Sequence, residues 1–120
     1  MKFYKCKKCN EVMIINDDII PSCCGEPMEE LIPGSVEAAK EKHIPVVSYD
    51  EGYLVTVGEV EHPMTEEHYI EWIAYELENE VVKVFDLKPN QKPMAIFKTD
   101  QKVKAVYAYC NLHGLWKVEM

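Results

Sequence analysis

The residue types in this chain that are best suited to chemistry are cysteine and histidine, and they fall into two groups. The first group holds four of the five cysteines, as the knuckle Cys6-Lys7-Lys8-Cys9 followed by the adjacent pair Cys23-Cys24. The second group holds the four histidines and the remaining cysteine, all of them after residue 42. Because thiolate sulfur and imidazole nitrogen bind zinc and iron, each group predicts a metal site.

The N-terminal cysteines can surround one ion tetrahedrally, since they supply four thiolates from two local pairs. This soft sulfur set selects zinc or iron over magnesium or calcium. Structural zinc is the more widespread outcome for such a cluster, but zinc ribbons place a spacer within each knuckle, and Cys23-Cys24 has none. A disulfide is disfavoured because adjacent cysteines bridge only with strain. A metal site with four cysteine ligands is therefore predicted, and Gly25 lets the chain turn tightly behind the pair.

The second group lies on connections between predicted strands. Two residues separate Cys110 from His113, so one tight turn can present sulfur and imidazole to the same ion. His62 and His68 flank a loop, and His43 precedes an Ile-Pro pair. A single loop histidine is most often simply solvated. Loops at one end of a β-sandwich, however, can bring all five side chains together.

Five ligands of this kind exceed the four that close a structural zinc site. Four imidazoles and one thiolate around octahedral iron leave one position open, where a small oxygen species can bind and be reduced. A thiolate opposite that position would push electron density toward the bound oxygen, as it does in thiolate-ligated haem. We therefore interpret the second group as a redox-active iron centre.

The elements that must position these residues follow from the turn signals. The chain of 120 residues has room for one ordinary domain and a small appendage, and the Pro33-Gly34 breaker predicts domains 1–34 and 35–120. A helical turn or two is expected in 35–42, with Ser35 as N-cap. Short strands are predicted at 53–60, 69–77, 81–87, 94–98, 103–110 and 115–119. The 69–77 segment also fits a helical stripe, but its β-branched and aromatic content favours a strand. The pattern is all-β and typical of a sandwich.

The charged residues exclude some partners. Thirteen lysines against 21 acids give a formal net charge of −8, and the chain contains no arginine. Neither nucleic acid nor an anionic membrane is expected as a partner. The negative net charge repels both, and the chain has no guanidinium group to bind phosphate with two hydrogen bonds. Without a long apolar run or an apolar signal core, a cytoplasmic location is expected. The stretch 35–80 holds twelve acids but only Lys40 and Lys42, so Lys42, beside His43, is placed to meet an anionic ligand.

Three segments resemble the motifs of superoxide reductases. They are Glu41-Lys42-His43-Ile44-Pro45, the run His62-Pro63-Met64-Thr65-Glu66-Glu67-His68-Tyr69-Ile70, and the run Tyr109-Cys110-Asn111-Leu112-His113-Gly114-Leu115-Trp116. The N-terminal cysteine segment resembles the desulforedoxin-like domain of the two-iron members, called desulfoferrodoxins. The resemblance covers nearly the whole chain and keeps all five ligands and both domains in the expected order.

The resemblance implies a role for each candidate residue. The equatorial ligands of a catalytic iron would be His43, His62, His68 and His113, and the axial thiolate would be Cys110. A second iron, or zinc in a given preparation, would be held by Cys6, Cys9, Cys23 and Cys24. Lys42 would guide superoxide to the open position, and Glu41 would occupy that position in the oxidised resting state.

The resemblance also implies a fold and a reaction. The fold would be a small rubredoxin- or desulforedoxin-like metal knuckle followed by an immunoglobulin-like β-sandwich, usually assembled as a homodimer. The reaction would be one-electron reduction of superoxide to hydrogen peroxide, with electrons supplied by rubredoxin or a similar donor. The competing interpretation is a non-catalytic zinc-binding interaction module.

Overall fold

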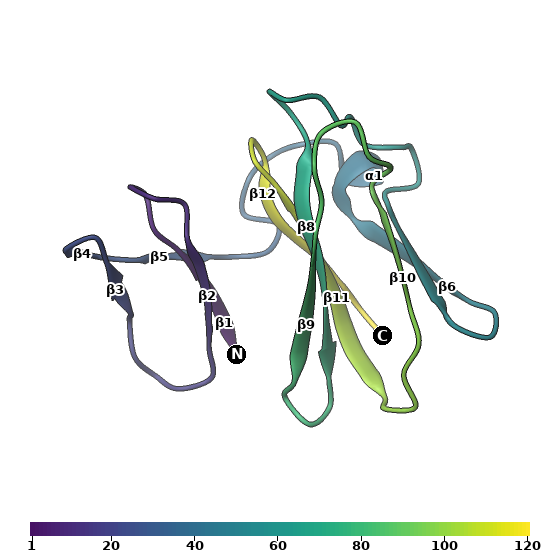
Figure 1. The fold of residues 1–120 in the computed structure, drawn as a ribbon, viewed down its shortest axis with the longest axis horizontal. Helices are drawn as coiled ribbons and strands as arrows, with labels where there is room; N and C mark the ends of the chain where they lie inside the picture. The colour runs from purple at the N-terminus through teal and green to yellow at the C-terminus, as the bar shows by residue number, and fades with distance from the viewer. The chain divides into compact units, whose positions relative to one another are not determined.

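The computed structural model describes residues 1–120 and divides into two compact units, Met1–Ile32 and Pro33–Met120 (Figure 1). Apart from one four-residue helix, the regular elements of both units are β-strands. The structure contains no helix that could span a membrane. The expectation of an all-β chain is confirmed.

The N-terminal unit contains two small antiparallel sheets. Its three-stranded sheet has the order β2-β1-β5 and consists of β1 (Lys2–Lys5), β2 (Val12–Ile15) and β5 (Glu29–Leu31). A short hairpin consists of β3 (Ser22–Cys23) and β4 (Glu26–Pro27). The buried hydrophobic residues of this unit are Phe3, Tyr4, Cys6 and Met28, and the last three form a cluster with Ile15 and Cys23 packed against it. A core this small rarely stabilises a fold without an additional cross-link such as a bound metal ion.

The C-terminal unit is a sandwich of two antiparallel sheets. The three-stranded sheet, with order β10-β7-β6, consists of β6 (Pro45–Tyr49), β7 (Tyr53–Val57) and β10 (Met94–Phe97). The four-stranded sheet, with order β12-β11-β8-β9, consists of β8 (Ile70–Leu77), β9 (Val82–Asp86), β11 (Val103–Cys110) and β12 (Gly114–Glu119). Three strands packed on four is the arrangement of constant-type immunoglobulin domains, so the predicted sandwich is confirmed.

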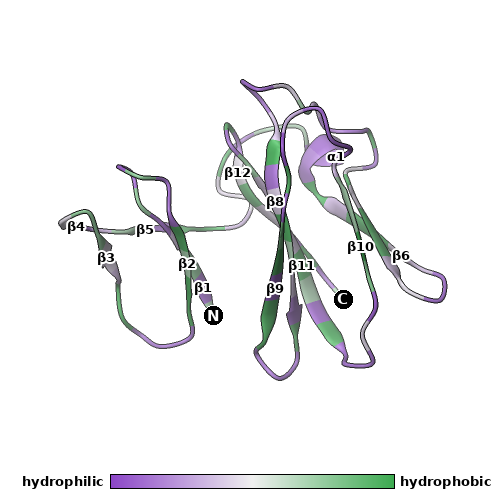
Figure 2. Cartoon of the chain, in the orientation of Figure 1, coloured by the Kyte–Doolittle hydropathy of each residue, from purple (hydrophilic) through white to green (hydrophobic).

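The core of the sandwich forms where the inward faces of the two sheets meet. Val55 and Val57 of β7 pack with Ile70 and Ile73 of β8, and all four are almost completely buried. The rings of Tyr75 (β8) and Phe97 (β10) stack across the sheets with their centroids 3.7 Å apart. Figure 2 shows the hydrophobic residues concentrated along these strands, while the connecting loops are largely hydrophilic. The sandwich is therefore a rigid support for the loops at its ends.

Two sequence-based expectations need correction. The helix is α1 (Lys40–His43) with Ala39 as its N-cap, so the start at Ser35 was wrong. Ala39 is extended, with ψ at 112°, so the helical turn does not continue back through it toward Ser35. The helix ends at His43 because the next residue, Ile44, is extended, as expected for a residue before proline. Strand β6 (Pro45–Tyr49) was not predicted at all.

Candidate metal centres

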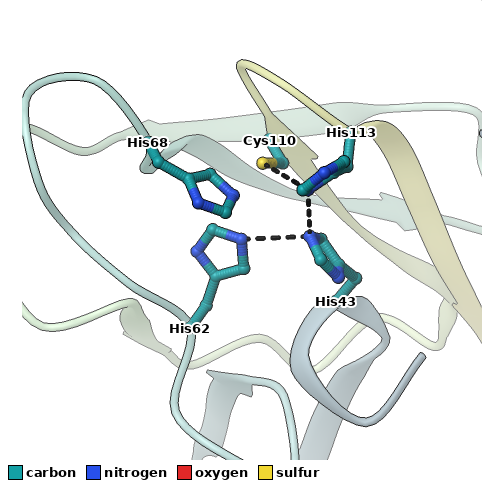
Figure 3. Close-up of side chains that lie close together, drawn as sticks. All are labelled: His43, His62, His68, Cys110 and His113. Atoms are coloured by element: carbon teal, nitrogen blue, oxygen red, sulfur yellow. Dashed lines mark hydrogen bonds between the residues drawn. The ribbon is translucent and has the colours of Figure 1, made fainter. Parts of the chain in front are cut away.

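The second group of ligands converges at one end of the sandwich (Figure 3). Its five donor atoms all lie within 4.8 Å of one another, and they belong to His43, His62, His68, Cys110 and His113. The five residues come from three separate parts of the chain: the last residue of α1, the loop between β7 and β8, and the turn from β11 to β12. The structure thus brings together every residue predicted for this site.

Two of the imidazole rings are oriented by backbone carbonyls. His43 donates from Nδ1 to the carbonyl of Ala39 at 2.6 Å, and His62 donates from Nδ1 to the carbonyl of Pro63 at 2.7 Å. In a neutral imidazole, a proton on Nδ1 leaves a lone pair on Nε2. The two Nε2 atoms nevertheless lie only 3.1 Å apart. Two lone pairs that face each other at this distance repel unless a cation lies between them.

The other two imidazoles complete the set of donors. His113 turns Nδ1 inward, 3.1 Å from Nε2 of His43 and 3.9 Å from Sγ of Cys110. Nε2 of His68 is buried and has no hydrogen-bond partner. A buried polar atom without a partner is rare in native proteins and needs an explanation. A metal ion inside this ring of donors satisfies all of them, so the residues present fit iron.

Burial keeps three imidazoles of the site in the neutral form. Burial lowers the pKa of His62 to about 4 and lowers the pKa of His43 and of His68. All three imidazoles are therefore neutral near pH 7, which is the form that binds metal. Burial also raises the pKa of the Cys110 thiol, although the backbone amides of Leu112 and His113 act in the opposite direction. Metal binding would thus release a proton from Cys110.

Trp116 contacts two of the ligand residues, His43 and His113. Its indole N–H donates to the carbonyl of His113 at 3.0 Å, and its ring lies 5.0 Å from the ring of His43. Trp116 is buried. It belongs to the third sequence motif, but the spacing of that motif gave it no role of its own. Hydrogen bonds and packing of this kind orient metal ligands and tune the metal.

Gly58 is a supporting residue that sequence reasoning missed. A Cβ atom at this buried position would lie 2.5 Å from the carbonyl oxygen of Glu41 and 2.9 Å from the carbonyl carbon of Lys42. Next to it, the amide of Val60 donates to the same Glu41 carbonyl at 2.9 Å. Glycine therefore allows the loop after β7 to lie directly against α1. Nothing in the sequence marks this close approach except the glycine itself.

Lys42 and Glu41 are both exposed beside the five-ligand site. The Lys42 charge acts on the rings of both His43 and His68, lowering the pKa of each, while the Glu41 charge acts on His43 and raises its pKa. Burial remains the larger cause of both histidine shifts. No carboxylate forms an ion pair with Lys42, so its ammonium group is available to an incoming anion.

The four N-terminal cysteines form the second cluster, and their sulfur atoms also lie within 4.8 Å of one another. Sγ of Cys9 is 3.5 Å from Sγ of Cys23, which in turn is 3.8 Å from Sγ of Cys24. The adjacent pair reaches one point because Cys24 and Gly25 both adopt positive φ, 52° and 78°. A hydrogen bond from the amide of Cys9 lowers the pKa of Cys6 to about 7. All five cysteines of the chain are free thiols, and this cluster fits a tetrathiolate iron or zinc centre.

The chain is similar to known proteins over most or all of its length. The family model described as Desulfoferrodoxin matches residues 35–119. A desulfoferrodoxin from Desulfarculus baarsii is 43% identical over 122 residues, which cover 99% of this chain and 96% of the relative.

Two solved structures are similar to this one. The superoxide reductase from Treponema pallidum has a TM-score of 0.83 and 33% identity, and the match covers 98% of each chain. The superoxide reductase (1Fe-SOR) from Giardia intestinalis has a TM-score of 0.57 and 34% identity, and the match covers 68% of this chain and 98% of that one. The smaller protein, described by its name as having one iron, thus corresponds to only part of this chain.

Proposed function

The chain belongs to the desulfoferrodoxin family of iron-binding oxidoreductases, and from this premise we propose that it is a superoxide reductase. In the proposed reaction, one superoxide anion takes up one electron and two protons and becomes hydrogen peroxide. The C-terminal domain, residues 35–120, would carry the reaction. The N-terminal domain, residues 1–34, would be a desulforedoxin-like metal domain.

One observation carries this proposal: four imidazole nitrogens and one sulfur surround a single point beside an unpaired lysine. Iron bound there by His43, His62, His68, His113 and Cys110 would supply the electron and an open position for the substrate. The carbonyls of Ala39 and Pro63 hold two of the rings in the tautomer that a metal requires. Such a set exceeds the four ligands of structural zinc, which argues against the zinc-binding interaction module.

Lys42 would draw the substrate toward the centre. Superoxide is an anion, and the chain carries a net charge of −8, so capture needs a local positive field. Lys42 can provide it because its ammonium group is exposed and has no ion-pair partner. Glu41, its neighbour on α1, would occupy the open position in the oxidised resting state and leave it when the centre is reduced.

The N-terminal site would hold the second iron of the protein. Its ligands Cys9 and Cys24 are exposed, which suits electron exchange with an external donor. We take that donor to be rubredoxin or a similar small electron carrier. The proposal includes a cytoplasmic location, since a reducing compartment keeps the five free thiols available for metal. It also includes a homodimer, as the family resemblance implies.

The yield of peroxide tests the reaction most simply. Iron-loaded, reduced protein is exposed to pulses of superoxide, and hydrogen peroxide and dioxygen are both measured. A reductase forms one peroxide for each superoxide and releases no dioxygen. Half that peroxide yield, with dioxygen released, would identify a dismutase instead, and no consumption of superoxide would leave the zinc-binding module as the better interpretation.

A further inference from the structure

The histidines of the five-ligand site are not held equally well. The Nδ1 atoms of His43 and His62 donate to backbone carbonyls, and the carbonyl of His113 accepts from Trp116. The ring of His68 makes no hydrogen bond, and its buried Nε2 has no partner. His68 also lies on a loop outside the strands. The hydrogen bonds that hold His68 in place are therefore those of its backbone and of the residues on either side of it.

The side chain of Asn111 forms hydrogen bonds with the backbone on both sides of His68. Its side-chain oxygen accepts from the amide of Tyr69 at 3.0 Å, and its side-chain nitrogen donates to the carbonyl of Glu67 at 3.0 Å. A third hydrogen bond, 3.2 Å long, runs from the amide of Asn111 to the carbonyl of Tyr69. Asn111 directly follows Cys110. One residue thus links the His68 loop to the turn that supplies both Cys110 and His113.

An amide side chain suits this position because it carries a donor and an acceptor at once. The other side chain that bonds to the backbone of His68 itself is Thr65, through its hydroxyl. Thr65 lies on the same loop, so it shapes the turn locally but connects it to no other ligand. Beyond the pairing of Ile70 with Cys110 in the sheet, the side chain that joins the His68 loop to the turn of Cys110 and His113 is that of Asn111.

We infer that Asn111 is a positioning residue that holds His68 at the correct distance from Cys110 and His113 for all three to bind one metal ion. The inference rests on the proposed function, because it assigns Asn111 to the same centre. Asn111 acts through backbone hydrogen bonds and does not itself touch the metal or the substrate.

The test measures metal affinity, not activity. One equivalent of Zn²⁺ fills the tetrathiolate site first and is colourless, and Co²⁺ then reports on the five-ligand site by its visible absorption. Loss of a residue that supports a metal ligand typically weakens metal binding by about 10–100-fold. We expect Asn111→Ala to raise the Kd for Co²⁺ by this factor and to alter the shape of its absorption spectrum.

Asn79→Ala is the matched control. The side-chain oxygen of Asn79 accepts from the amide of Val81 at 3.2 Å in the hairpin between β8 and β9, away from the ligands. This variant also removes an asparagine that bonds to backbone, but it should leave the Kd for Co²⁺ unchanged.

A double-mutant cycle with His68→Ala separates positioning from general support of the fold. If Asn111 acts through His68, adding Asn111→Ala to His68→Ala should weaken Co²⁺ binding no further. Equal loss in both backgrounds, or no loss with Asn111→Ala alone, would overturn the inference. If Asn111→Ala fails to fold, Asn111→Asp serves in its place, because it keeps the acceptor for Tyr69 and loses only the donor to Glu67.

The failure of this inference is distinguishable from failure of the proposed function. If the wild-type chain binds Co²⁺ without a thiolate absorption band, Cys110 is not a ligand and the metal centre is wrong as a whole. If the wild-type band appears but Asn111→Ala behaves like Asn79→Ala, only the role of Asn111 is wrong.

Discussion

The two metal centres of this chain are built in opposite ways. The ligands of the N-terminal centre lie within residues 6–24, in or next to tight turns of a unit with only four buried hydrophobic residues. The ligands of the second centre are spread over residues 43–113 and are brought together by a sandwich with an extensive core of its own. Local sequence therefore assembles the first centre, and the metal must hold its fold. The fold assembles the second centre, which is free to leave a position open for chemistry.

Metal removal should reveal the largest difference between the two units. When a chelator strips both sites, we expect the N-terminal unit to lose its structure while the sandwich stays folded. The reason is that metal binding supplies roughly 10 kcal/mol or more of folding free energy to small tetrathiolate units. Residue-resolved amide hydrogen exchange measures the loss of structure in each unit. Amides of β1 should lose protection and those of β8 and β11 should keep it.

Protected β1 amides in the metal-free protein would show that the N-terminal unit folds without its ion. Unprotected β8 amides would show that the sandwich depends on metal as well. Either result would remove the difference between the two centres.

Gly58→Ala probes how tightly the sandwich holds α1 against the loop after β7. The new methyl group would overlap the carbonyl of Glu41, so α1 and Lys42 must shift. Overpacking of this kind typically costs about 1–3 kcal/mol, and we expect that loss in denaturant unfolding of the sandwich.

Gly52→Ala is the control for this experiment. Its added Cβ would lie 3.2 Å from Cγ of Lys98, a flexible and exposed side chain that can move aside. This variant should stay close to wild type in stability. Equal stability of Gly58→Ala and Gly52→Ala would mean that the close approach at Gly58 is not needed.

Lys42→Ala tests whether the second centre recruits an anion. Loss of the unpaired cation next to His43 should slow the second-order reaction with superoxide about tenfold at low ionic strength and flatten its salt dependence. Pulse radiolysis over a range of salt concentrations measures both effects. Lys40→Ala changes the net charge equally from the same helix and should have the smaller effect.

Unchanged rates for Lys42→Ala across ionic strengths would contradict its proposed role. Equal slowing by both substitutions would instead assign the effect to net charge, with no special part for Lys42.

The features visible in the sequence were those that local spacing encodes. The Cys-x-x-Cys knuckle and the pair Cys110/His113 are short motifs, and the long strand at residues 103–110 alternates clearly. The helical stripe in residues 69–77 gave an ambiguous pattern, and the structure resolves it as β8 because the segment pairs with β9 and β11.

Other features depend on contacts that no local pattern records. Strand β6 begins with a proline and is defined by pairing with β7, so its short run of residues gave no clear signal. The helix α1 starts only at Lys40 because Ala39 before it is extended, and no residue type near Ala39 indicated this. The tautomers of His43 and His62 depend on which carbonyl each ring meets, and the role of Gly58 depends on a helix that approaches from elsewhere in the chain.

The central claim is that Cys110 and four histidines bind one iron, separately from the iron of the N-terminal cysteines. The most direct measurement combines iron content per chain with the oxidised-minus-reduced visible spectrum of wild type and Cys110→Ser. We predict two irons per wild-type chain and a thiolate-to-iron(III) band on oxidation that Cys110→Ser abolishes, while the tetrathiolate spectrum remains. One metal per wild-type chain, or a band that survives in Cys110→Ser, would contradict the claim.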